Sequence, residues 1–227
     1  ASLENTENNL VLVAAKALAG HARLRSGAEI CLTKNLPVAA GIGSGSADAA
    51  AVMKALAALW EIPWDEAVMG ALAGNLGADV PVCLMARATF IGGIGELLDA
   101  APTLPECGLL LVNPGVQLAT PSVFLARAGK FGQAARFDGP PADAASLATL
   151  LAARRNDLTQ AALQLAPVIG KVLEAMDAEG AHLARMSGSG ATCFGLFDDP
   201  EVAEVVGERL RHNHPGWWVA AGSWADT

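Results

Sequence analysis

The chain contains no tyrosine, and only 17% of its 227 residues are charged, against 52% that are hydrophobic. Its net charge of −8 and the lack of any Lys/Arg cluster argue against a nucleic-acid-binding surface. A small anionic ligand is still compatible with this charge, because such a ligand needs local donors only. Gly, Pro or a charge interrupts every apolar run before it could span a bilayer. The composition therefore predicts a globular protein that binds neither nucleic acid nor membrane.

Cysteine is also sparse, and its four positions carry no metal-binding pattern. Cys31, Cys83, Cys107 and Cys193 are far apart, without a CxxC pair or a histidine at ligand spacing. This spacing argues against a zinc site and indicates the reduced thiols of a cytoplasmic protein. There is no signal peptide pattern, and the first residue is not Met. Together with the missing tyrosine, this start leads us to expect that a front segment is absent from the sequence.

Helices and strands are expected in both halves of the chain, with a new unit beginning near Cys107. Periodicity and capping residues predict helices and a strand in the first half, followed by an extended segment after Asp79 and a β-hairpin. The expected helices are 8–20, 47–59 and 63–77, the strand is 28–37 and the hairpin is 88–98. In the second half we expect strands near 108–115 and 216–223, a strand–turn–strand over 182–197, a loop or lid over 129–145, and helices at 120–128, 145–153, 157–179 and 199–212. The hairpins favour a mixed or antiparallel α+β architecture.

Three alternate glycines, Gly41, Gly43 and Gly45, stand directly before an alanine-rich helix. A helix N-terminus leaves backbone N–H groups unpaired and carries about half a positive charge, and glycine lets that backbone approach a phosphate. Ser44 and Ser46 add hydroxyl groups. The spacing matches neither a P-loop nor a Rossmann fingerprint. On these residues alone, an anion site and a turn without a ligand are equally good interpretations.

The surrounding segments resemble the GHMP kinases. Pro37 followed by "GIGSGSADAA" is similar to the second motif of that family, and "MSGSGATCFGLF" is similar to its third. "NNLVLVAAKAL", "NLGADVPVCL", "GIGE", and "NPG" with "TP--F" occur in the family's order, so the resemblance covers nearly the whole chain. It implies a two-domain α+β GHMP kinase fold. We expect a mixed α/β ATP-binding domain over 1–106 and a ferredoxin-like α+β domain over 107–227.

The resemblance implies a site whose residues come from several segments. Asp79 matches the catalytic aspartate, which would accept or orient the proton of the attacking hydroxyl; the alternative is an Asp that caps a turn before Val80 and Pro81. The implied ATP-binding residues are Asn9, Leu10, Lys34, Pro37, Val38, Ala39, Ala40, Gly41, Ile42, Gly43, Ser44, Gly45, Ser46 and Ala47. The implied substrate-binding residues are Asp79, Thr120, Phe124, Ser187, Gly188, Ser189 and Gly190.

Several of these residues also have a structural interpretation. Asn9, Leu10 and Lys34 could instead be an N-cap, a core leucine and a solvated charge, and Phe124 could be a core residue of a helix that Thr120 caps. The pair Asn156–Asp157 resembles a family "ND" pair and is interpreted as a helix N-cap. Ser46 is a possible magnesium ligand, and the other metal ligands stay open.

The expected activity is transfer of phosphate from Mg²⁺-ATP to the 2-hydroxyl of a cytidine diphosphate derivative of methylerythritol, in non-mevalonate isoprenoid synthesis. The alternatives are a homoserine or mevalonate kinase of the same family, and a nucleotide-binding module without catalysis. The last is kept because the family's first motif, with its lysine, and its "DGYH" segment have no counterpart in this sequence. A dinucleotide-dependent oxidoreductase is disfavoured, because no acidic ribose partner follows the loop helix. Monomer and homodimer both stay open.

Overall fold

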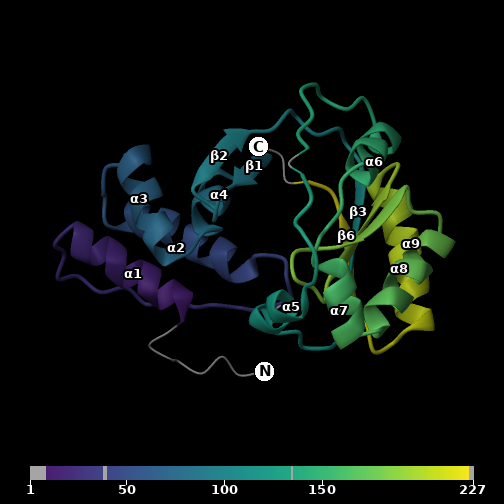
Figure 1. Ribbon diagram of the computed structural model, residues 1–227. Helices are drawn as coiled ribbons and strands as arrows, with labels where there is room; N and C mark the ends of the chain where they lie inside the picture. The colour runs from purple at the N-terminus through teal and green to yellow at the C-terminus, as the bar shows by residue number, and fades with distance from the viewer. Residues whose placement is uncertain (1–8, 38–39, 134, 225–227) are drawn as a thin grey trace. The chain divides into compact units, whose positions relative to one another are not determined.

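The computed structural model describes residues 9–37, 40–133 and 135–224. These residues form two compact units, one built from the described residues up to 34 together with 43–100, and the other from the described residues of 35–42 and 101–224. Between residues 9 and 224 the chain therefore passes from one unit to the other after residues 34, 42 and 100, and the second of these points lies among the glycines before α2. Figure 1 labels the helices and strands of both units, and each unit is described by itself below.

The first unit is a group of helices with a short hairpin. Buried side chains from all four helices form its core, including Leu18, Met53, Leu56, Met69 and Val80. The mixed helix and sheet content that the sequence predicted for this half is present. Its elements are α1 (Leu10–His21), α2 (Ser44–Leu59), α3 (Glu66–Leu76), α4 (Val80–Met85), β1 (Thr89–Gly92) and β2 (Leu97–Ala100).

Two helices of this unit, α2 and α3, begin at other residues than the sequence predicted. α2 begins at Ser44, three residues before the predicted start, because Gly43 takes a left-handed conformation (φ 67°) as its N-cap. α3 begins after Asp65, whose side chain accepts from Val68 N at 3.0 Å, so Pro63 precedes the helix. The predicted end at Gly77 is confirmed. α1 extends one residue beyond Gly20, to His21.

The predicted strand over 28–37 is wrong, and so is the extended segment after Asp79. Ile30 and Leu32 do pack on the core, as the alternation requires. A strand also needs a ladder partner, and none of the described residues pairs with this segment. After Asp79 the chain forms α4. Pro81 is compatible with this helix because it lies in the first turn, where a backbone N–H would have no partner within the helix. The hairpin is confirmed, with Thr89 opposite Ala100 and Gly92 opposite Leu97.

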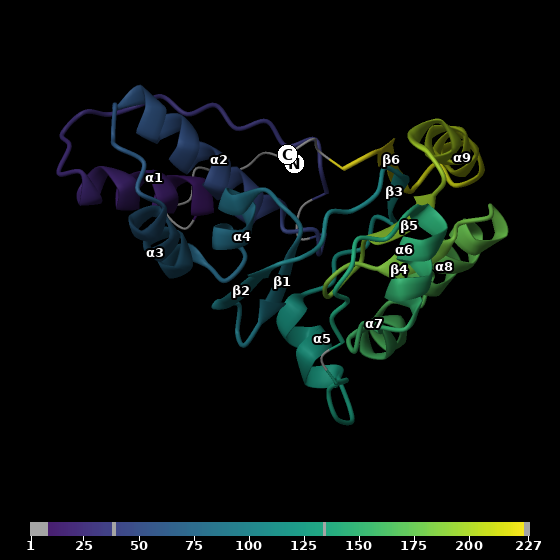
Figure 2. The ribbon, with the colours of Figure 1, turned by 90° about the horizontal axis from the view of Figure 1, so that it is seen from above.

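The second unit contains a four-stranded sheet in the order β4-β5-β3-β6, with every neighbouring pair antiparallel. Each β–α–β crossover skips one strand, which is the ferredoxin-like arrangement, and the expectation for this half is confirmed. Figure 2 shows α8 and α9 beside this sheet. The elements are β3 (Gly108–Asn113), α5 (Thr120–Ala126), α6 (Ala144–Ala152), α7 (Thr159–Leu165), α8 (Val168–Ala178), β4 (Leu183–Met186), β5 (Cys193–Phe197), α9 (Pro200–Asn213) and β6 (Trp218–Gly222).

Alternation along β3 and β5 divides the apolar side chains of this unit into two clusters. Leu110 and Val112 pack with residues of α8 and α9, whereas Leu109 and Leu196 pack with α6. Because strand side chains point to opposite faces in turn, both faces of the sheet are covered. The helix predicted at 199–212 is α9, and Asp199 caps it by accepting from Val202 N at 2.8 Å.

Two predictions for this unit are wrong. The single helix over 157–179 is two helices, α7 and α8, because Pro167 cannot donate the hydrogen bond that would continue α7. Thr120 is the first residue of α5, and Ala119 occupies the N-cap position without a side-chain hydrogen bond. The segment before α6 is irregular where the structure describes it, as expected. No helix within the described residues is long and apolar enough to cross a membrane.

Candidate active site

The N-terminus of α2 presents backbone donors without a side-chain cap. Ser44, Gly45 and Ser46 form the first turn of this 16-residue helix, and Gly43 has no side chain with which to cap them. Among the described residues, the first amide of the turn with a backbone acceptor is that of Ala47, which donates to Gly43 O at 3.0 Å. The three amides before it are the ones that a helix cannot satisfy internally. The chemistry here is that of an anion site.

The residues just before this helix belong to the second unit and are held by its other glycine-rich turn. Ala40 O accepts from Thr192 N at 3.2 Å, and Gly41 O accepts from Ser187 Oγ at 2.9 Å. Gly41 has a φ of 73°, and a Cβ there would lie 2.5 Å from Gly190 O. Only glycine fits this contact between two backbones. Pro37 and Ile42 are half-buried, and Val38 and Ala39 lie outside the described residues.

The turn of Ser187–Gly190 is closed by its own backbone and by a buried polar pair. Gly190 N donates to Ser187 O at 2.9 Å, and Ser187 N donates to Thr192 O at 2.9 Å. Asn113, at the end of β3, donates from Nδ2 to Thr192 Oγ1 at 2.9 Å and accepts from Gly115 N at 2.8 Å. Since Asn113 and Thr192 are buried and hydrogen-bonded to each other, they fix the base of the turn.

Ser189, within this turn, is joined to α5. Its hydroxyl lies 2.8 Å from Thr120 Oγ1. Phe124, one helical turn after Thr120, is 51% exposed, while the buried residue of α5 is Val123. The structure thus brings Thr120 to the glycine turn, and it does not make Phe124 a core residue.

Asp79 occupies the N-cap position of α4, and its side chain does not cap the helix. Its backbone is in the right-handed helical region (φ −87°, ψ −14°), whereas a capping residue is usually extended. The residue is exposed, so the carboxylate is available to solvent and ligands. α4 packs against α2, the helix with the uncapped N-terminus, within the same unit (Figure 1).

The predicted adenine-contacting residues have structural partners. Asn9 Oδ1 accepts from Val11 N at 3.1 Å and caps α1, and Leu10 packs on the core of the first unit. Lys34 forms an ion pair with Asp48 of α2, and both side chains are largely covered, at 19% and 27% exposure. Adenine contact at these three residues stays a prediction.

Three of the four cysteines have thiols whose pKa is raised, which disfavours the nucleophilic thiolate form. Burial raises the pKa of the Cys83 thiol, and the negative charge of Asp79 raises it further. Burial also raises the pKa of Cys107, and it raises the pKa of Cys193 to about 12. No group of three or more His, Cys, Asp or Glu within the described residues could hold a metal ion.

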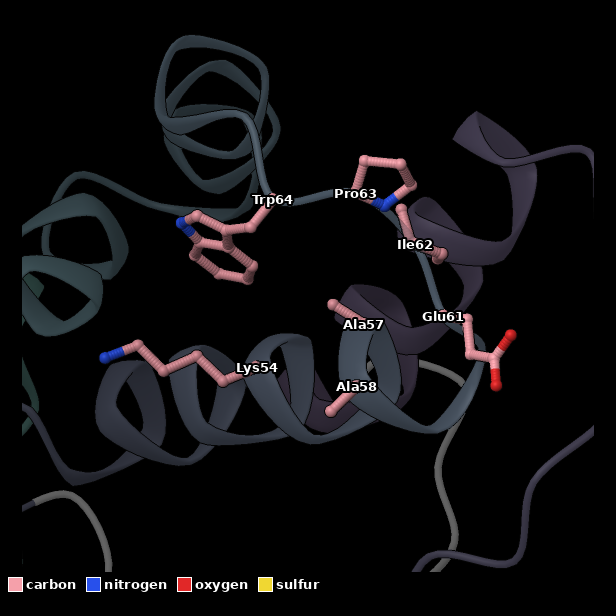
Figure 3. A pocket seen from close by; sticks show the side chains of 7 residues that line it. All are labelled: Lys54, Ala57, Ala58, Glu61, Ile62, Pro63 and Trp64. Atoms are coloured by element: carbon pink, nitrogen blue, oxygen red, sulfur yellow. The ribbon is translucent and has the colours of Figure 1, made fainter.

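A surface cavity of about 410 Å³ lies at the C-terminal end of α2. Figure 3 shows the Trp64 indole above this helix, with Lys54 on the helix and Glu61 pointing away. None of the sequence-predicted site residues that the structure describes lines this cavity, which is formed by Lys54, Ala57, Ala58, Glu61, Ile62, Pro63 and Trp64.

Sequence reasoning missed or misplaced three polar residues around these turns. Asn113 and Asp48 were not singled out, and Asn156 was interpreted as a helix N-cap. The N-cap of α7 is Leu158, and Asn156 instead donates to Met186 O and Gly188 O at 3.0 and 2.7 Å. The resemblance of Asn156–Asp157 to a family pair was the only signal that could have pointed to it.

Two family models match the chain: the GHMP kinases N terminal domain over residues 9–87 and the GHMP kinases C terminal domain over 139–216. The chain belongs to the GHMP kinase family. Among its curated relatives, the 4-diphosphocytidyl-2-C-methyl-D-erythritol kinase of Paramagnetospirillum magneticum is 51% identical over 213 residues, covering 93% of this chain and 75% of that protein. The kinase of the same name from Rhodospirillum rubrum is 50% identical over 222 residues, covering 97% of this chain and 73% of the relative.

Solved structures agree with this assignment. A crystal structure of 4-(cytidine 5'-diphospho)-2C-methyl-D-erythritol kinase superposes with a TM-score of 0.79 at 33% identity, covering 98% of this chain and 80% of that one. Homoserine kinase from Cytophaga hutchinsonii superposes with a TM-score of 0.74 at 18% identity, covering 96% of this chain and 77% of that one. The second likeness shows the shared fold alone.

Proposed function

We propose that this chain is a kinase that transfers the γ-phosphate of ATP to the 2-hydroxyl of 4-diphosphocytidyl-2-C-methyl-D-erythritol. The uncapped N-terminus of α2 is the observation that carries the proposal, together with the exposed Asp79 on the helix packed against it. About 50% identity to kinases of that name supports the choice of acceptor. We further propose that residues 1–106 form the ATP-binding domain and residues 107–227 the second domain.

The phosphate groups would bind at the glycine-rich loop. The amides of Ser44, Gly45 and Ser46 point out of a helix whose partial positive charge is not neutralised by a cap. Gly43 adds no side chain that would obstruct the approach. ATP supplies the phosphoryl group, and these fixed donors would hold its charged oxygens while the bond to the leaving diphosphate breaks.

Asp79 would act on the acceptor alcohol. The hydroxyl oxygen forms the new bond to phosphorus, and its proton passes to the Asp79 carboxylate as ADP leaves. An exposed carboxylate without a cap bond is available for this contact. Much of the acceleration would come from in-line positioning of the hydroxyl, since phosphoryl transfer needs little covalent chemistry from the protein.

The cytidine end of the acceptor would lie against the second unit. The ring of Phe124 is half exposed and offers a stacking face for a nucleobase. Thr120 and the turn Ser187–Gly190 carry hydroxyl and amide donors, and they are already joined through Ser189. These groups suit a polar nucleotide end.

Mg²⁺ is proposed as the accompanying ion. Such an ion is usually held by one or two protein groups and by substrate phosphates, so it does not require a cluster of protein ligands. Ser46, through its hydroxyl, is the group of this chain that would contribute, and it belongs to the first unit.

Initial rates with ATP and three acceptors test the proposal. The purified protein is assayed on 4-diphosphocytidyl-2-C-methyl-D-erythritol, homoserine and mevalonate, with ADP formation as the readout. We expect kcat/KM for the cytidine compound to exceed the other two by at least about a hundredfold, because a site built to bond polar groups rejects acceptors that lack them. Turnover of mevalonate or homoserine in its place would assign a different kinase, and ATP binding without turnover of any acceptor would favour the non-catalytic module.

A further inference from the structure

Asn156 uses every hydrogen-bonding group of its side-chain amide. Nδ2 donates to Met186 O at 3.0 Å and to Gly188 O at 2.7 Å, and Oδ1 accepts from Leu158 N at 3.0 Å. The two carbonyls lie on either side of Ser187, at the end of β4 and in the glycine-rich turn. A primary amide has two N–H donors, and here each has its own carbonyl. Asn156 therefore sets the orientation of the peptide group before Ser187 and of the peptide group after Gly188.

Ser187 passes this orientation to the first glycine-rich loop. Its Oγ donates to Gly41 O at 2.9 Å. The fit is close in both directions, since a Cβ on Gly41 would lie 2.9 Å from Ser187 O and a Cβ on Gly188 would lie 2.8 Å from Gly41 O. A backbone shift of a few tenths of an ångström at residues 186–188 would therefore break the bond to Gly41 or force its backbone to move.

We propose that Asn156 is a positioning residue for the nucleotide site: it holds the Met186–Gly188 backbone so that Ser187 fixes Gly41, two residues before the N-cap of α2. This inference rests on the proposed function, because it assumes that the loop ending at Gly43 binds phosphate. Asn156 is half-buried. Its bonds to the turn span 30 and 32 residues of sequence, so it links the segment before α7 to the site.

The Asn156→Asp variant distinguishes the role of Asn156 in the glycine-rich turn from its hydrogen bond with Leu158 N at the start of α7. The Asp variant keeps an acceptor for Leu158 N and the same shape, and it replaces two donors with a charged oxygen that faces two carbonyl oxygens. Asp157→Asn is the matched control. Asp157 accepts from Gly132 N at 2.6 Å and pairs with Arg155, and it makes no bond to the turn.

Two measurements on the purified protein test the inference. The first is amide hydrogen exchange without nucleotide. We expect N156D to speed exchange over residues 187–192, where Gly190 N and Thr192 N are bonded, and to leave α3 unchanged. The second is affinity for a non-hydrolysable ATP analogue. We expect it to fall about tenfold in N156D, because two hydrogen bonds are lost and their carbonyl acceptors are left unpaired. In D157N we expect it to stay within about twofold.

A double-mutant cycle with Ser187→Ala decides whether Asn156 acts through Ser187. We expect N156D/S187A to bind the analogue no more weakly than the weaker single variant, because residues that act in series are not additive. Additive losses, or unchanged exchange over 187–192 in N156D, would overturn the inference. Failure of the unmodified protein to bind the analogue would instead contradict the proposed function, while the exchange result would still decide whether Asn156 holds the turn. If N156D does not fold, Asn156→Ser, which keeps a smaller polar group, takes its place in both measurements.

Discussion

Gly41 and Gly43 both have positive φ values, and they differ in what surrounds them. A Cβ on Gly41 would lie within 3 Å of three backbone atoms of the facing turn, whereas a Cβ on Gly43 would meet nothing within 4 Å. Gly43→Ala therefore bears only the left-handed backbone cost, about 1 kcal/mol. Gly41→Ala adds overpacking, so we expect a loss of about 3 kcal/mol in the free energy of unfolding. Urea unfolding of both variants measures the difference.

Equal losses for the two variants would show that Gly41 does not touch the turn of Ser187–Gly190. The comparison also tests the close contact between Gly41 and this turn, on which the proposed role of Asn156 depends, and it requires no ligand. It is therefore independent of the assignment of an activity.

Asp79→Asn isolates the proposed proton acceptor. We expect kcat to fall by about 10²- to 10⁴-fold, the usual contribution of a positioned general base. Affinity for a non-hydrolysable ATP analogue should change by less than about threefold, because the α2 amides that would hold the phosphates are untouched. Steady-state kinetics and calorimetric titration supply the two values.

Asp65 provides the matched control, since it stands in the same place before a helix. Asp65 caps α3 through Val68 N, and Asp79 does not cap α4. Asp65→Asn should leave kcat within about twofold, while Asp65→Ala should cost about 1 kcal/mol of stability as a lost cap. A variant at Asp79 that retains full turnover would remove this residue from the reaction.

At the scale of elements, the sequence predicted best those features that neighbouring residues determine. The helix ends at Asp199 and Gly77 and the hairpin of β1 and β2 are such local features. Asp65 was predicted inside the helix that it caps. The segment 28–37 was predicted wrongly because a strand depends on a partner elsewhere in the chain. The apolar run after Asp79 is short, and periodicity alone does not distinguish a short buried strand from a helix.

The candidate site was predictable only in part, for a related reason. Glycine-rich turns and their serines are visible in the sequence, and the structure places Ser187–Gly190 against Gly41. The side chains that hold these turns bond to residues far away in sequence. Asn113 is 79 residues from Thr192, and Asn156 is 30 from Met186. No local pattern specifies such contacts.

Asp143 and Ser146 form a capping box at the N-terminus of α6, which makes the stability of this helix depend on pH. Hydrogen bonds from Ser146, first from its backbone N–H, lower the pKa of Asp143, and the charge of His182 contributes further. A lowered pKa in the folded state means that the stabilisation is present above the unfolded-state pKa and is lost as the pH falls through the folded-state value. We expect the urea midpoint of the unmodified protein to fall more than that of Asp143→Asn as the pH drops below about 4. Parallel profiles for the two proteins would contradict this assignment.

At the scale of the whole molecule, the chain carries a net charge of −8 and yet is proposed to bind a polyanion. The proposed donors are backbone amides at the N-terminus of α2, which do not depend on net charge, and Asp48 in the second turn of that helix is paired with Lys34. The glycine-rich segment also contributes to both compact units, with 35–42 in one and 43 onward in the other. A kinase of this family thus uses one short stretch of chain to build two parts of its fold.

The transfer of phosphate itself is the most direct test of the proposed activity. The purified protein is incubated with Mg²⁺-ATP and 4-diphosphocytidyl-2-C-methyl-D-erythritol, and the products are followed by ³¹P NMR. We predict a new phosphomonoester resonance on the acceptor, coupled to its carbon-2 position, that grows in step with ADP. ATP that persists unchanged, or is hydrolysed to free phosphate without a phosphorylated acceptor, would contradict the account.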